Sequence, residues 1–406
     1  MPDWRALSVW TQLIALPEVQ AAAEAVHPTD ASAIARLRRS ADADLVSAAL
    51  ELAQARRKAA LKFPSSRAAE LWCDVAGVEQ ASGELVAAWK ALRMREVLGE
   101  GGQILDLCCG IGGDAMALSK CGLRVTAIDL DPRRAWMAEQ NARCAVQVAD
   151  AESLAFEGAV LHADPARRDE AAGSRSWKVD DHTPGRAWME RALTITRAGA
   201  IKFSPGVDRR EFRSIPLEWE FIETRDGHTA RLVQAVAWSG AFARAAGCTR
   251  ATVLSNDATP ATLVGVPDDA RADRIGIAAA VRVDDWISEP CAALERAQLL
   301  TTAVGGEARE LVYGVGLVTS PSPLAAPWFE SFRVVEECAA KAQVIAEVLT
   351  RHGLRARSVR VRGQAADADA LTKALRARSD GDAVIFAFRR GERTKALIAR
   401  IDRSST

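Results

Sequence analysis

The residues best suited to chemistry lie where a short apolar strand ends in a glycine-rich turn. The segment Ile104–Asp114 reads ILDLCCGIGGD, and its turn contains Gly110 and Gly112 before a helix begins. Glycines let the backbone turn tightly and approach a ligand closely. The G-x-G-G spacing differs from the G-x-G-x-x-G of dinucleotide-binding folds, and a tight turn that binds nothing is the alternative. Asp106 precedes the turn, where its carboxylate could reach an ammonium group of a ligand.

Two further acids close the next two predicted strands. Asp129 ends a strand about 20 residues after the turn, where a carboxylate can accept hydrogen bonds from both hydroxyls of a ribose. Asp150 could bind an adenine amine, either by itself or through the backbone of Ala151. Ligands of open parallel sheets bind at the carboxyl ends of the strands, so these acids are expected at one crevice. The alternative, an acid that only serves a helix N-terminus, suits Asp131 better than Asp129.

A fourth acid, Asp164, follows the predicted strand Ala159–Ala163 in the sequence Asp-Pro-Ala-Arg-Arg. Pro165 would fix this loop, and Asp164 could orient an attacking nitrogen or oxygen or accept its proton. The alternative is that Asp164 only caps the turn, but a buried acid in such a loop is costly, which favours a catalytic role. The guanidinium of Arg167 or Arg168 could stack on a base or hold a phosphate.

The elements that must position these residues alternate between strands and helices. This alternation predicts a mostly parallel sheet covered on both faces, closed by a hairpin around Asp226-Gly227. The chain is therefore expected to have four parts. They are an N-terminal helical region (1–99), an α/β core (100–240), a connecting α/β region that ends in a Pro/Ser-rich linker (241–330), and a small basic α/β domain that opens with a helix over Val334–His352 (331–406).

The four motifs, in this order, resemble those of class I S-adenosylmethionine-dependent methyltransferases over about residues 100–240. The resemblance implies an enzyme with a Rossmann-like core and S-adenosylmethionine as its cofactor. It implies a catalytic site at Asp164, Pro165 and Arg167. The residues that it implies for cofactor binding are Asp106, Cys108, Gly110, Gly112, Asp114, Asp129, Leu130, Asp150 and Ala151.

A closer resemblance is to bacterial methyltransferases with a C-terminal THUMP-like domain. It is carried by DLCCGIGGD, by DPARR and by Lys202–Gly206 (KFSPG), and Lys62, Glu79 and Gln80 also fit. THUMP domains bind RNA, so the resemblance implies methylation of a nucleobase in tRNA or rRNA, with Lys62 and Arg168 as candidate substrate contacts. The sequence departs from the D/N-P-P-Y/F/W motif of amine methyltransferases at Ala166 and Arg167. Trp177 or Trp188 could supply the missing stacking face.

Charge is distributed unevenly along the chain. Residues 331–406 contain 16 Lys and Arg against 9 Asp and Glu, whereas the other 330 residues contain 37 against 44. The basic part includes Arg355, Arg357, Arg360 and Arg362, which alternate along a predicted strand, and a turn at Arg389–Arg393. Such a row could contact RNA phosphates. The alternative is a basic edge strand that discourages aggregation.

Composition narrows the remaining function classes. No apolar run reaches the roughly 18 residues of a membrane helix, and the first residues lack the pattern of a signal peptide, so a cytoplasmic location is expected. None of the eight cysteines forms a C-x-x-C pair, so no metal site is expected. Two rival functions stay open: a small-molecule or protein methyltransferase, and a catalytically inactive protein that binds S-adenosylmethionine or RNA. The oligomeric state is not predicted.

Overall fold

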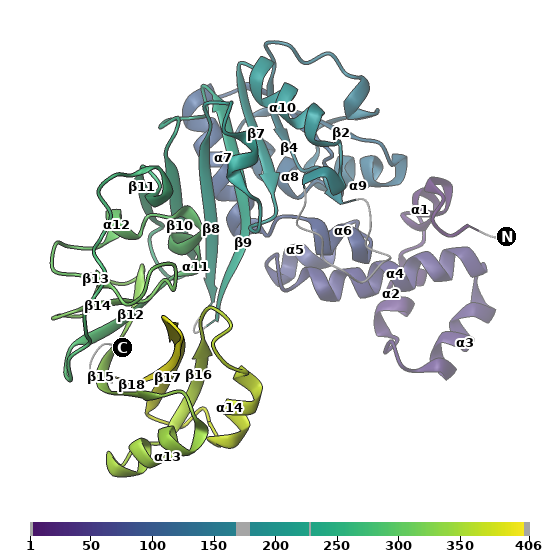
Figure 1. Cartoon of the computed structure of the whole chain (residues 1–406). Helices are drawn as coiled ribbons and strands as arrows, with labels where there is room; N and C mark the ends of the chain where they lie inside the picture. Colours follow the sequence, from purple (N-terminus) through teal and green to yellow (C-terminus); the bar gives the residue numbers. More distant parts are fainter. Residues whose placement is uncertain (1–2, 168–178, 227–228, 402–406) are drawn as a thin grey trace. The chain divides into compact units, whose positions relative to one another are not determined.

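The computed structural model describes residues 3–167, 179–226 and 229–401, which form two compact units (Figure 1). The first unit contains the chain up to Gly247 together with residues 254–259. The second unit contains residues 248–253 and the chain from Pro260 onward.

The first unit begins with the helices that the composition predicts. They are α1 (Leu7–Leu13), α2 (Pro17–Ala25), α3 (Ala31–Ser40), α4 (Ala43–Ala59), α5 (Ser65–Glu70), α6 (Val75–Gln80) and α7 (Glu84–Leu98). Aspartates cap several of these helices, since the carboxylates of Asp30, Asp42 and Asp74 accept hydrogen bonds from backbone N–H groups of the first turn. Buried residues of these helices, such as Trp10 and Leu52, belong to the same hydrophobic cluster as residues of the sheet that follows.

The sheet of the first unit has five parallel strands in the order β7-β4-β1-β2-β3. Their bounds are β1 (Gln103–Leu107), β2 (Arg124–Asp129), β3 (Ala145–Val148), β4 (Val160–Ala163) and β7 (Ala198–Phe203). The predicted hairpin forms from β8 (Glu218–Asp226) and β9 (Thr229–Gly240), and β9 lies antiparallel to β7. The strand order reverses between β1 and β4, which is where open sheets of this kind have a ligand-binding crevice.

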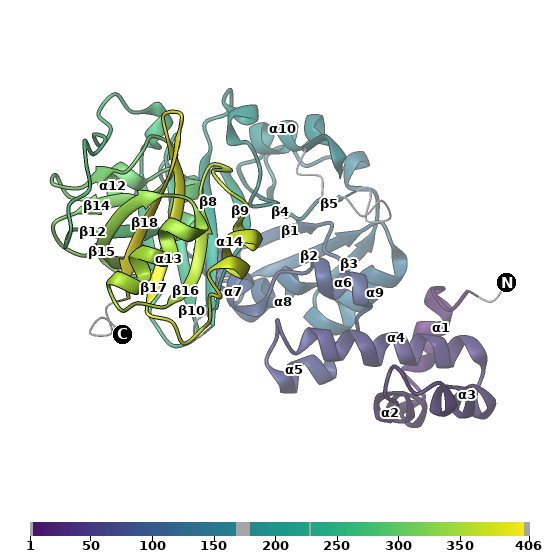
Figure 2. The ribbon, with the colours of Figure 1, turned by 60° about the horizontal axis from the view of Figure 1, so that its bottom comes forward.

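Helices cover both faces of this sheet. They are α8 (Gly113–Lys120), α9 (Pro132–Ala142) and α10 (Arg186–Ile195). Figure 2 shows α10 on one side of the sheet and α8 on the other. On the α8 side, Ile104 and Ala127 of the strands are buried in one cluster with Leu118. A two-stranded ribbon, β5 (Ala166–Arg167) with β6 (His182–Thr183), follows Asp164. The expected α/β core is therefore present, but its sheet is mixed and not mostly parallel, because the hairpin strands β8 and β9 extend the five parallel strands in antiparallel fashion.

The second unit is built on a seven-stranded sheet in the order β13-β14-β12-β15-β18-β17-β16. The strands are β12 (Trp286–Pro290), β13 (Arg309–Glu310), β14 (Val318–Ser320), β15 (Phe329–Ala339), β16 (Ala356–Val361), β17 (Ala383–Arg390) and β18 (Arg393–Arg400). On one face, Ile345 of α13 (Ala342–Arg351) and Leu371 of α14 (Ala368–Ala374) are buried against β17 and β18. The smaller elements are β10 (Thr249–Ser255), which pairs with β11 (Ala261–Gly265), and the short helices α11 (Ala292–Ala297) and α12 (Leu300–Ala303).

The structure differs from the sequence expectations in this second unit. The predicted helix over Val334–His352 is wrong in its first half, because Val334–Ala339 belong to β15 and the helix starts at Ala342. A register shift between Val334 and Glu336 interrupts the two-residue periodicity that marks a strand. The sequence of this segment therefore indicates a helix although it forms a strand. The boundary expected at 330/331 falls inside β15, which pairs with β12 on one side and β18 on the other.

Within the described ranges, no helix is long and apolar enough to cross a membrane. Among the same residues, no group of three or more His, Cys, Asp or Glu side chains is placed to hold a metal ion.

Candidate active site

The glycine-rich turn after β1 is shaped by three residues with positive φ. Cys108 and Gly110 have φ of 57° and Gly112 has φ of 83°. A Cβ on Gly112 would lie 3.0 Å from the Cα of Ala138, so this glycine lets the turn pack directly on α9. A Cβ on Gly110 would meet no heavy atom within 4 Å, so the backbone at Gly110 borders open space. A ligand can therefore approach the turn at Gly110.

Asp129 ends β2 beside this turn. Its Oδ2 accepts a hydrogen bond from the backbone N–H of Gly110 at 2.8 Å, and its Oδ1 accepts one from the N–H of Asp131 at 2.9 Å. Burial raises the pKa of Asp129. Each carboxylate oxygen has a second lone pair, so Asp129 can still accept hydrogen bonds from a vicinal diol. The next residue, Leu130, is 64% exposed and offers an apolar surface at the same edge.

Asp150 follows β3 and caps a single 3₁₀ turn, Ala151–Ser153. Its Oδ1 accepts the backbone N–H of Glu152 at 2.9 Å. The carbonyl of Ala151 accepts the indole N–H of Trp188 at 3.0 Å. Trp188 is 7% exposed and packs edge-on against Phe156, so its ring belongs to the core and not to an open stacking surface.

The register of the parallel strands brings their carboxyl ends to one edge of the sheet, because Leu107 lies opposite Ile128 and Ala163, and Asp129 lies opposite Val148. Burial raises the pKa of the Cys108 thiol well above its usual value, and the nearby carboxylates of Asp129, Asp164, Asp106 and Asp150 raise it further. The ends of β1, β2, β3 and β4 therefore share one acidic edge with the glycine-rich turn, as expected at the carboxyl end of a parallel sheet.

Two of the acids expected to bind the cofactor, Asp114 and Asp106, take part in a buried charge network. Asp114 Oδ1 lies 2.7 Å from Lys90 Nζ, and Asp114 Oδ2 accepts the hydroxyl of Ser82 at 2.9 Å. Lys90 is 1% exposed. Burial opposes the ionisation of Asp114, but the ammonium group of Lys90 outweighs it, so the pKa of Asp114 is lowered. Asp114 therefore contacts Lys90 of α7.

Asp106 is connected to the same network by His162. The Nε2 of His162 lies 3.2 Å from Lys90 Nζ, which can only donate, so we assign the proton of the ring to Nδ1, 2.7 Å from Asp106 Oδ1. Burial raises the pKa of Asp106. Within the described chain, the buried Oδ2 of Asp106 has no hydrogen-bond partner. A buried oxygen of this kind requires a partner, and the ammonium group of a bound ligand is a suitable one.

Asp164 lies directly after β4 and is held by a lysine. Its Oδ2 is 2.6 Å from Nζ of Lys202 on β7, and Lys202 also donates to the carbonyl of Gln80 at 2.9 Å. Pro165 is buried, and the backbone of Arg167 pairs with His182 in the β5–β6 ribbon. Arg168 and Trp177 lie outside the described residues.

Lys62 does not point toward solvent. Its ammonium group donates to the carbonyls of Val78 at 2.7 Å, Glu79 at 2.6 Å and Ala81 at 3.0 Å. Burial and the neighbouring ammonium of Lys202 lower the pKa of Lys62 to about 8. All three donors of the ammonium group are engaged by the backbone of the last turn of α6 and the residue after it.

The basic row of the second unit is not a uniform phosphate-binding face. Arg360 pairs with Glu289 and, at 2.8 Å, with Glu330, and Arg362 pairs with Glu289. Arg355 lies before β16, 3.5 Å from Asp380. Arg357 is exposed, at a register shift of the strand. Glutamates therefore engage two of the four arginines that were expected to contact phosphates.

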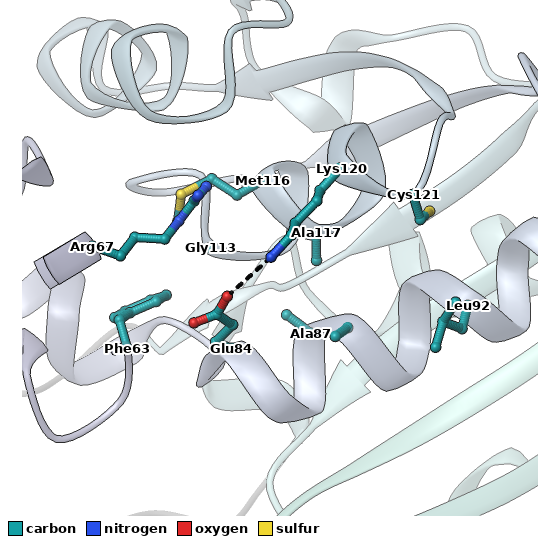
Figure 3. Close-up of a pocket in the computed structure, with 11 residues that line it drawn as sticks. Phe63, Arg67, Glu84, Ala87, Leu92, Gly113, Met116, Ala117, Lys120 and Cys121 are labelled. Atoms are coloured by element: carbon teal, nitrogen blue, oxygen red, sulfur yellow. Dashed lines mark ion pairs between the residues drawn. The ribbon is translucent and has the colours of Figure 1, made fainter. Parts of the chain in front are cut away.

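A pocket of about 270 Å³ lies elsewhere in the first unit, between α7 and α8 (Figure 3). Its walls are mostly apolar and include Phe63, Leu92 and Met116, and an ion pair between Lys120 and Glu84 crosses it at 3.5 Å. None of the described residues predicted to bind cofactor or substrate lines it. The pocket is thus separate from the acidic edge.

The sequence did not predict the side chains that contact the site residues from distant parts of the chain. Lys202 was expected only as part of the Lys202–Gly206 motif, and no role in the site was predicted for Lys90 or His162. Lys90 shares α7 with Glu84, Arg93 and Arg95, so nothing in the local sequence distinguishes it from an exposed helix charge.

Comparisons with known proteins agree with this geometry. Residues 104–163, which run from β1 to β4, match the family model of a methyltransferase domain. A protein from Mycobacterium tuberculosis strain H37Rv, named as an uncharacterized S-adenosylmethionine-dependent methyltransferase, is 29% identical over 318 residues, covering 74% of this chain and 80% of the relative. A solved Porphyromonas gingivalis W83 protein with a provisional methyltransferase name superimposes with a TM-score of 0.74 at 16% identity, over 97% of this chain and 99% of that protein. This similarity confirms the predicted Rossmann-like methyltransferase fold.

Proposed function

We propose that this chain, an S-adenosylmethionine-dependent methyltransferase, methylates a nucleobase in tRNA or rRNA. The predicted enzyme class and the predicted methyl donor are confirmed by the matches to a methyltransferase domain and to the mycobacterial relative. The acceptor is the proposal. The observation that carries the site assignment is the strand register that brings the acids at the ends of β1, β2, β3 and β4 to one edge of the sheet, next to the open backbone at Gly110.

The residues at this edge fit S-adenosylmethionine. We assign the ribose to Asp129, the adenine to Asp150, Ala151 and the exposed Leu130, and the ammonium group to the unpartnered oxygen of Asp106. The backbone from Cys108 to Gly112 would pass along the amino-acid part. Asp114 supports this edge through Lys90 and His162. When bound, the cofactor supplies a methyl group already activated by its sulfonium, so the protein mainly has to align the acceptor.

We assign the acceptor to the side of the site at Asp164. The ion pair with Lys202 fixes one carboxylate oxygen, and the other oxygen would accept a hydrogen bond from the attacking group. Pro165 is buried and restricts the loop, and Arg167 is a candidate for stacking on the base.

RNA as the acceptor is supported by the THUMP-like resemblance of the C-terminal residues and by their excess of cations. The structure shows which of the arginines expected to contact RNA phosphates are exposed. Arg357, Arg389 and Arg393 are exposed, whereas Arg360 and Arg362 are paired with glutamates. We therefore place the phosphate contacts at Arg357 and at the β17–β18 turn, with a cytoplasmic location in keeping with an RNA substrate.

The test is to incubate the protein with methyl-labelled S-adenosylmethionine and total RNA from a strain that lacks the gene. Digestion to nucleosides should give one labelled base, and the Asp164→Asn variant should give none. Label in purified metabolites or proteins, with none in RNA, would show that the acceptor is wrong. Tight cofactor binding without transfer to any of these would identify a binding protein.

A further inference from the structure

The backbone that leaves α6 is held by lysines at four successive carbonyls. Lys62 takes the carbonyls of residues 78, 79 and 81, and Lys202 takes that of Gln80. The last carbonyls of a helix have no partners within the helix, and cations are favoured there. Two ammonium groups from α4–α5 and from β7 thus converge on one short segment.

This segment lies against both halves of the proposed site. On one side, a Cβ on Gly77 would lie 2.4 Å from Cγ2 of Ile111, so α6 packs directly on the glycine-rich turn. On the other side, the Lys202 ammonium that binds the Gln80 carbonyl also binds Asp164 at 2.6 Å. The N-terminal end of α6 is fixed as well, since its cap Asp74 pairs with Arg133 of α9 at 2.7 Å.

We propose that Lys62 and Lys202 form a two-lysine clamp that holds residues 78–81 as a wall of the acceptor site. In this clamp Lys202 is a positioning residue for the carboxylate of Asp164. The proposal rests on the assignment of Asp164 to the acceptor side. The proposal makes the N-terminal helices part of the active site. The motifs of the α/β core alone do not predict such a role.

The clamp has a charge balance that can be measured. The groups that face Lys62 are Lys202 from β7, Asp164 after β4 and Glu79 from α6, and Glu79 is itself paired with Lys58 of α4. Lys202 opposes the charge on Lys62, and the two carboxylates favour it. Above a pH of about 8 Lys62 becomes a neutral amine. A neutral amine has two N–H groups for three carbonyls, so above this pH one of the three hydrogen bonds from Lys62 is lost.

The first test does not need an acceptor. The ¹³Cε signal of Lys62, assigned with Lys62→Arg, should titrate near pH 8 and move to higher pH in Lys202→Met, because a neighbouring cation is removed. Amide hydrogen exchange at residues 79–83 should speed up at least about tenfold in Lys62→Met and stay near wild type in Lys62→Arg. The control is Lys120→Met, a mostly exposed lysine on α8. A Lys62 midpoint at the ordinary value, or unchanged exchange in Lys62→Met, would overturn the clamp.

The second test uses the labelled RNA of the previous section. Lys202→Met should lower kcat at least about tenfold while the Kd for S-adenosylmethionine stays within about twofold, and Lys202→Arg should recover part of the loss. Wild-type kcat should fall above about pH 8, and Lys62→Arg should remove that fall. If no RNA is labelled, the acceptor proposal fails while the first test still decides the clamp. If RNA is labelled and Lys202→Met keeps wild-type kcat, the positioning role is refuted.

Discussion

The assignment of Asp129 to the ribose makes a quantitative prediction. In the Asp129→Ala variant two hydrogen bonds from ribose hydroxyls to a carboxylate are lost. Each bond to a charged group contributes about 1.5–3 kcal/mol, so the loss is at least about 3 kcal/mol. At 1.4 kcal/mol per factor of ten, the Kd for S-adenosylmethionine should rise about a hundredfold or more. The missing bond to the N–H of Gly110, 2.8 Å long, also releases the turn and adds to the loss.

A matched pair of variants separates binding from folding. Asp129→Asn keeps one acceptor oxygen and should lose roughly half of the ribose hydrogen-bond contribution, a rise in Kd of about tenfold to a hundredfold. Asp131→Ala is the control, because the Asp131 side chain accepts the N–H of Arg133 at 2.8 Å and caps α9. Its removal should cost about 1 kcal/mol of stability and leave the Kd within about twofold.

Isothermal titration calorimetry with S-adenosylmethionine measures these constants, and urea unfolding reports the stability of each variant. The reasoning is refuted if Asp129→Ala, shown to be folded, binds the cofactor as tightly as wild type. It is also refuted if Asp131→Ala weakens binding as much as Asp129→Ala, since the effect would then come from the shape of the β2–α9 turn.

Three further predictions follow from single contacts. Asp164→Asn should leave the Kd for S-adenosylmethionine within about twofold and lower kcat at least about a hundredfold; a matching rise in Kd would place Asp164 on the cofactor instead. Gly112→Ala should lower the free energy of unfolding in urea by about 1–3 kcal/mol, because φ is 83° and the new Cβ meets Ala138. Gly110→Ala should lose less stability and more cofactor affinity. Equal effects of the two substitutions would contradict the open space at Gly110. Arg357→Ala should weaken RNA binding in filter assays and reduce the slope of log K against log salt by about 1. Arg360→Ala should mainly lower the stability of the protein, because Glu289 is left with less positive charge beside it. If Arg360→Ala weakens RNA binding more than Arg357→Ala does, Arg360 contacts the RNA after all.

The sequence predicted the features of the site that are local in the chain. The glycine-rich turn, Asp129 after β2, Asp150 after β3 and the β8–β9 hairpin all lie where spacing and periodicity put them. These features follow from neighbouring residues alone, because strand ends and turns have their own composition.

The partners of the site residues could not be predicted, because they come from distant parts of the chain. Asp114 turns toward Lys90, and Asp106 is held by His162, 56 residues away. Spacing along a strand or helix does not tell which face another helix will cover. The arginine row was misjudged for the same reason, since Glu289 is 71 residues from Arg360.

The strand β15 shows a different limit. Its register shift moves the buried positions out of the two-residue period, and the charged run Glu336–Glu337 then resembles a helix surface. Pairing with β12 and β18 overrides this local preference, because a strand between two others gains hydrogen bonds along both edges.

The most direct test of the central claim is a crystal structure of the full chain with S-adenosylhomocysteine. The account predicts the ribose on the carboxylate of Asp129, the adenine between Leu130 and Asp150, and the amino-acid part along Cys108–Gly112 toward Asp106. Density for the nucleoside in the apolar pocket between α7 and α8, or at any place that leaves Asp129 bound only to Gly110 and Asp131, would contradict it.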